Sequence, residues 1–125
     1  QMIYLEVIEQ TMEDKLNKLK EYLQMDTEIS VAEFKDYYSS VIEYLNKNYD
    51  QMDQDNRLKA RYICSIIQTN AESRSYKDKK NAKIFRKISA KCSFWIDAID
   101  YRLIKEGLTQ PDIEQAMNEI NKKME

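Results

Sequence analysis

The chain contains a single glycine, Gly107, and a single proline, Pro111, among its 125 residues. The tight turns that join β-strands draw heavily on both residue types because of their special backbone angles. With only one glycine and one proline, a β-rich fold is disfavoured and helices joined by a few polar loops are favoured. We therefore predict an all-α fold, a single-domain helical bundle of about five helices over residues 1–125, with Gln1 a remnant of expression.

Apolar residues recur every three or four positions along most of the chain, which is the spacing of amphipathic helices. The pattern predicts helices over residues 2–23, 31–45, 55–69, 76–106 and 109–124. Ser30 is expected to cap the second helix, and a similar capping motif begins at Ser75. Residues 70–75 are the predicted break before the fourth helix. Gly107 is placed to end that helix in a left-handed conformation.

The predicted long central helix, near 76–106, carries the only tryptophan, Trp95. A second apolar stripe begins after Cys92 and consists of Phe94, Ala98 and Tyr101. A helix that is apolar nearly all round is buried on several sides. We therefore expect the C-terminal half of this helix to be the centre of the bundle, with Trp95 and Ile99 almost completely buried.

The length of this helix also predicts self-association. A helix of about 30 residues is about 45 Å long. That is longer than a compact domain of this size needs. Something should cover the projecting part, and a second copy related by a two-fold axis is the commonest solution.

Charge is strongly segregated along the chain, although the total is only −2. Residues 57–91 hold 11 Lys or Arg and 2 Asp or Glu, a net charge of +9, and the segments on either side are acidic. Six of these cations are candidate contacts for nucleic acid or for a protein partner: Lys77, Lys80, Lys83, Arg86, Lys87 and Lys91.

Three interpretations of the basic segment remain open. Its charges can pair inside the fold with the acidic first helices, for example with Glu6, Glu9 and Glu13, which would add little stability. They can instead bind an acidic protein or a second copy of the chain. They can also bind nucleic acid, because several cations on one helical face suit a phosphate backbone. A membrane surface is not favoured, because the apolar stripe beside the cations is narrow.

Nine tyrosines are a second surface signal. Tyrosine combines a large apolar ring with a polar tip and is enriched at protein interfaces. Tyr37, Tyr44 and Tyr49 are therefore candidate interface residues. The alternative is that they lie half-buried where helices cross.

Chemistry is limited by what the sequence lacks. There is no histidine, which excludes Ser-His-Asp and Cys-His catalysis and histidine-bound zinc. With one glycine there is no glycine-rich phosphate loop. The Asp-rich segment 50–56 fails the EF-hand pattern, because Asp55 and Arg61 stand where Gly and Glu are required. We expect Asp97 and Asp100 to orient their helix rather than bind metal, and we assign no catalytic residue, cofactor, metal or small-molecule substrate.

Cys64 and Cys92 fit no zinc or redox spacing, so we interpret them as reduced thiols packed in the core. With no signal peptide and no apolar run of about 20 residues, a cytoplasmic location is expected. Composition rich in Lys, Asn and Ile suits an AT-rich bacterial or phage genome.

These features predict a small non-enzymatic protein that acts as a protein-interaction or regulatory module and self-associates. The alternative is a nucleic-acid-binding accessory protein that uses the basic segment 57–91.

Overall fold

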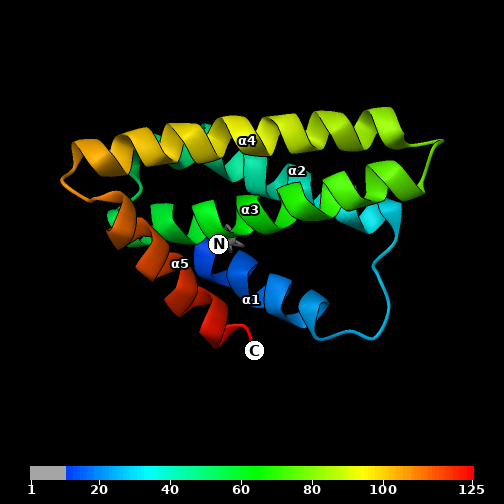
Figure 1. Ribbon diagram of the computed structural model, residues 1–125, viewed down its shortest axis with the longest axis horizontal. Coiled ribbons are helices and arrows are strands. Elements are labelled where there is room, and N and C mark those ends of the chain that lie inside the picture. Colours follow the sequence, from blue (N-terminus) through cyan, green and yellow to red (C-terminus); the bar gives the residue numbers. More distant parts are fainter. Residues whose placement is uncertain (1–10) are drawn as a thin grey trace, which may run out of the picture.

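The computed structural model describes residues 11–125, and within them it contains five α-helices and a short 3-10 helix but no strand (Figure 1). The elements are α1 (Met12–Leu23), α2 (Val31–Asn48), η1 (Tyr49–Gln51), α3 (Gln54–Lys77), α4 (Ala82–Lys105) and α5 (Gln110–Lys123). The predicted all-α bundle with long central helices is confirmed. Glu6, Glu9 and the rest of positions 2–10 of the helix predicted over 2–23 lie outside the described residues.

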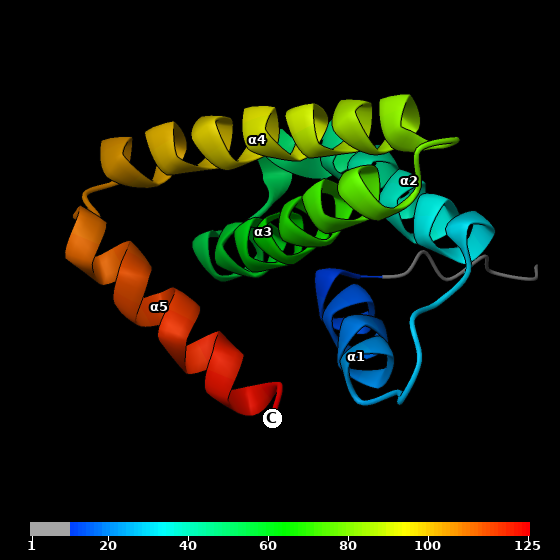
Figure 2. The same ribbon diagram turned by 45° about the vertical axis from the view of Figure 1, so that its right-hand side comes forward.

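The two long central helices, α3 and α4, pack side by side, and the helix that contacts all the others is α3 rather than the C-terminal half of the segment 76–106. α3 contacts each of the other four α-helices. In Figures 1 and 2, α4 lies along one side of α3, while α1 and α5 lie toward the other. The sequence pattern missed this centre because α3 buries small side chains, which mark a core stripe less clearly than leucine does. Ala60, Cys64 and Ala71 are fully buried on one face of α3. Small residues let two helices approach closely.

α3 is longer than predicted, and α4 is shorter. The break expected at 70–75 is wrong, because α3 continues to Lys77 and α4 begins only at Ala82. Polar side chains in this stretch bond back to their own helix: Asn70 Nδ2 donates to the Ile66 carbonyl and Ser75 Oγ to the Glu72 carbonyl. They therefore do not break the helix.

The chain reverses instead at 78–81. The Asp78 carboxylate accepts hydrogen bonds from the backbone N–H of Asn81, at 3.2 Å, and from its side-chain amide, at 2.8 Å. A short aspartate that bonds to the backbone beyond it is a common way to form a turn without glycine. The capping motif expected at Ser75 is therefore not used.

α4 is buried along one stripe only. Trp95 and Ile99 are 8% and 0% exposed, as predicted. Of the second stripe only Ala98 packs against the core, because Phe94 and Tyr101 are 58% and 66% exposed. Ile104, one turn further on, is 47% exposed. The expectation that this half of α4 is buried on several sides is wrong.

Local signals set most of the helix ends. Ser30 Oγ accepts from the Glu33 N–H at the start of α2, as predicted. Gly107 has φ +104° and follows the last turn of α4, where Leu108 N–H donates to the Leu103 carbonyl at 3.1 Å. A left-handed glycine with this bond is the common end of a helix. Thr11 was not predicted as a cap, but its backbone is extended and its side chain caps α1, which begins at Met12.

The observed length of α4 does not support the prediction of self-association. α4 has 24 residues and runs beside α3, which has the same length. No part of α4 therefore projects alone. Self-association now depends on the exposed residues of α4 rather than on its length.

Candidate interaction surface on α4

Eight exposed side chains define what we call the outer face of α4: Lys83, Arg86, Lys87, Lys91, Phe94, Asp97, Tyr101 and Ile104. They recur at steps of three or four, so they lie along one side of the helix. The first four are basic and the last four are mostly apolar, so the face has a basic half and an aromatic half.

The cations of the basic half have no carboxylate partner in the described part of the chain. Within residues 11–125, no carboxylate oxygen lies within 4.0 Å of the charged nitrogens of Lys83, Arg86, Lys87 or Lys91. Lys80 is equally unpaired and exposed in the turn before α4. These positive charges are therefore available to an external anionic group.

The α3 part of the basic segment behaves differently. Lys59 Nζ lies 2.8 Å from a Glu13 oxygen and 2.7 Å from an Asp55 oxygen. Arg61 pairs with Asp100 of α4 through two hydrogen bonds. Arg57 is buried, and its Nη1 donates to Glu106 at 2.9 Å. Internal pairing therefore accounts for the three cations in the first two turns of α3, and the segment 57–91 does not form one continuous surface.

Lys77 belongs with neither group. Its Nζ lies 3.9 Å from a Glu28 oxygen, and both side chains are mostly exposed. An exposed pair at this distance contributes little to stability. Among the six predicted contact residues, the structure therefore brings Lys83, Arg86, Lys87 and Lys91 together on α4.

The aromatic half was missed as a surface. Its signal was the second apolar stripe, which the sequence pattern assigned to the core. Lys91 Nζ lies 5.4 Å from the centre of the Phe94 ring, and Lys105 Nζ lies 5.3 Å from that of Tyr101. Lysines over exposed rings combine charge with apolar area, a combination that protein and nucleic-acid partners can both use.

The three candidate tyrosines join helices. Tyr37 is buried, and its hydroxyl donates to the Lys15 carbonyl at 2.7 Å. Burial raises the pKa of Tyr37 well above its usual range. Tyr49 is half-buried, and its hydroxyl donates to the Ala98 carbonyl at 3.1 Å. Tyr44 is also half-buried, with Lys15 above its ring. Tyr37 is therefore in the core rather than on the surface, and Tyr44 and Tyr49 match the half-buried alternative.

The two cysteines lie in the core, as predicted. Cys64 of α3 and Cys92 of α4 are both free and fully buried. A hydrogen bond with Cys92 raises the pKa of the Cys64 thiol, and burial raises it further. Neutral thiols are poor nucleophiles and poor metal ligands. Among residues 11–125, no group of three or more Cys, Asp or Glu side chains is placed to hold a metal ion.

The aspartates of α4 have separate positions. Asp100 holds α4 to α3 through Arg61, which agrees with the orienting role expected for it. Asp97 lies exposed on the outer face.

The chain matches no family model, no curated protein and no solved structure. Within the described residues, no helix is both long and apolar enough to cross a membrane.

Proposed function

We propose that this chain is a non-enzymatic protein-interaction module that self-associates through the outer face of α4. One observation carries the proposal: Phe94, Tyr101 and Ile104 are about half exposed or more, so no other part of the described chain covers them. Contiguous exposed apolar groups bordered by charges mark interaction sites on many proteins. The free cysteines suit a reducing compartment, so we place the function in the cytoplasm.

The distribution of charge favours an antiparallel pair of α4 helices. A two-fold axis level with Phe94 would put Asp97 of one copy level with Lys91 of the other. It would also put Tyr101 level with Lys87. Each basic half would then face the aromatic half of the second copy, and the two basic halves would stay apart. Such a self-complementary contact is what a two-fold dimer requires.

Sedimentation equilibrium tests this proposal. We expect a dimer at tens of micromolar, and Phe94→Glu should make it a monomer without changing helix content by circular dichroism. Met25→Glu is the matched control, because Met25 is also 50% exposed but lies outside α4. It should leave the dimer intact. A wild-type chain that sediments as a monomer would refute self-association.

A charge exchange tests the antiparallel geometry. Lys91→Glu should weaken the dimer, because it would face Asp97 of the second copy. Adding Asp97→Lys should restore the association by reversing both partners. If the double variant associates no better than Lys91→Glu alone, the antiparallel register is wrong.

Nucleic-acid binding is the second candidate, and the unpaired cations of the basic half favour it. Together with Lys80, that half can contact roughly four phosphates, so we expect a log–log salt slope near −3 to −4 on duplex. Lys83→Glu with Lys87→Glu should abolish the binding, while Lys122→Glu with Lys123→Glu makes the same charge change on α5 and should not. No binding to duplex or single strands at low salt would remove this candidate.

A further inference from the structure

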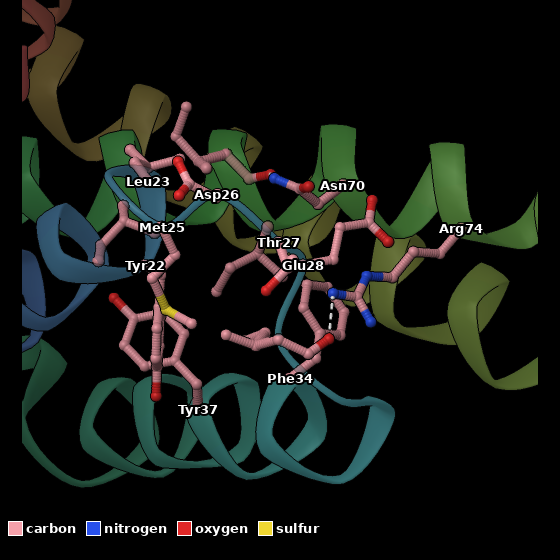
Figure 3. A pocket seen from close by; sticks show the side chains of 14 residues that line it. Tyr22, Leu23, Met25, Asp26, Thr27, Glu28, Phe34, Tyr37, Asn70 and Arg74 are labelled. Carbon is pink, nitrogen blue, oxygen red and sulfur yellow. Dashed lines mark hydrogen bonds between the residues drawn. The ribbon is translucent and has the colours of Figure 1, made fainter.

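A cavity of about 240 Å³ lies away from α4, between α1, α2, α3 and the link at residues 24–30 (Figure 3). Most of its wall is apolar, with Leu19 from α1 and Ile66 and Ile67 from α3. Leu23 and Met25 also line it and are 45% and 50% exposed, so they lie where the cavity meets solvent. A concave apolar site with a few polar groups is the usual form of a small-molecule site.

One wall of the cavity holds the buried guanidinium of Arg74, which is only 8% exposed. Figure 3 shows this side chain reaching from α3 toward Phe34 of α2. Its Nη2 donates to the Ile29 carbonyl at 2.9 Å, and its guanidinium carbon lies 4.5 Å from the centre of the Phe34 ring. Its Nε is buried with no hydrogen-bond partner in the described part of the chain.

The charge of Arg74 has no carboxylate partner within 4.0 Å in residues 11–125. The other fully buried arginine, Arg57, also leaves its Nε unbonded, but Glu106 lies 2.9 Å from its Nη1. The difference between the two is therefore the missing counter-charge. A buried charge is unfavourable unless it is paired, and a ring face compensates it only in part. Arg74 is thus equipped to receive an anion.

The acidic residues beside the cavity limit the kind of anion. Asp26 and Glu28 also line it, and they repel a small inorganic anion that brings no apolar group. A carboxylate with an apolar chain gains in addition from burial against Leu19, Ile66 and Ile67. The volume lies below the range typical of sites for drug-sized ligands, so the chain must be short.

We propose that this cavity binds a small organic monocarboxylate with an apolar tail. The carboxylate accepts charge-assisted hydrogen bonds from Arg74, and the tail occupies the apolar wall formed by α1 and α3. This proposal is independent of the proposed dimer, because the cavity and the outer face of α4 share no residue.

Octanoate is the probe, and the Arg74 Nε–H signal in nitrogen-edited NMR spectra is the readout. We expect a saturable shift of that signal with octanoate, and binding of 1-octanol that is weaker by roughly tenfold or more, because it lacks the charge. Acetate, which has the charge without the tail, should not saturate the site at the same concentrations. Arg74→Gln should lose octanoate affinity by a similar factor.

Lys77→Gln is the control variant, since it removes an exposed positive charge near Glu28 without changing the cavity lining. It should bind octanoate as the wild type does. Equal affinity for octanoate and 1-octanol, no saturable binding of octanoate, or binding that leaves the Arg74 signal unmoved would each overturn the proposal. The comparison of the three probes uses the wild-type protein, so it decides the matter even if Arg74→Gln fails to fold.

Discussion

Trp95 offers a sharp test of the packing between α4 and the rest of the bundle. Its indole is 8% exposed, and its ring centre lies 5.2 Å from that of Tyr49 in an edge-to-face arrangement. Its Nε1–H is buried and has no hydrogen-bond partner among the described residues. Trp95 therefore contributes a large apolar surface and, at the same time, an unsatisfied donor.

These two properties predict different results for two substitutions. Trp95→Ala should lower the free energy of unfolding by about 3–5 kcal/mol, because it leaves a cavity and removes the contact with Tyr49. Trp95→Phe keeps an aromatic ring and loses about 1–2 kcal/mol of burial. It also removes the unsatisfied donor, which returns about 1–3 kcal/mol. The net change for Trp95→Phe should therefore lie between a loss of about 1 kcal/mol and a gain of about 2 kcal/mol.

Urea unfolding followed by circular dichroism at the helix band measures both variants without needing tryptophan fluorescence. The slope of free energy against urea should stay unchanged, so that a shift in midpoint reports stability alone. If Trp95→Phe is as destabilising as Trp95→Ala, the indole N–H is hydrogen-bonded and Trp95 does not carry an unsatisfied donor. If Trp95→Ala has almost no effect, the packing of α4 described above is wrong.

Three further predictions concern pairs inside the bundle. Asp100→Asn should destabilise the fold by about 1.5–3 kcal/mol, because Arg61 would lose a charged partner. Asp97→Asn on the exposed face should change stability by about 0.5 kcal/mol or less. Equal effects of the two substitutions in urea unfolding would contradict the pairing of Arg61 with Asp100. Burial, followed by a hydrogen bond with Glu33, raises the pKa of Tyr22 to about 12, and burial also raises that of Tyr37. Both folded pKa values exceed the usual 10.0, so the stability that neutral Tyr22 and Tyr37 contribute is complete below pH 10.0 and is lost as the pH rises above it. The melting temperature should therefore fall above that pH. A melting temperature that stays constant up to about pH 12 would show that the two hydroxyls are not buried as described. Cys64 and Cys92 should resist iodoacetamide in the native protein and react after unfolding, and rapid native labelling would show that the core is open.

The sequence alone was sufficient wherever the deciding contacts are local. Ser30 and Gly107 were placed correctly at helix ends because a cap involves residues within about five positions of one another. The burial of Trp95 and Ile99 was also predictable, since the stripe through them recurs with the helical period along the whole of α4. Asp78 was missed as a turn residue because polar residues at 70–75 looked equally able to break a helix.

Tertiary structure decided everything that depends on which helix packs against which. A helical period shows that Phe94 and Tyr101 share a face, but not whether another helix covers that face. Likewise, Arg57, Arg74 and Lys87 look alike in the sequence, yet one is buried with a carboxylate, one is buried without a carboxylate, and one is exposed. The neighbours of each arginine and lysine come from distant parts of the chain, as Glu106 does for Arg57. Only folding brings those groups together, so only the structure distinguishes a paired charge from one that can bind a partner.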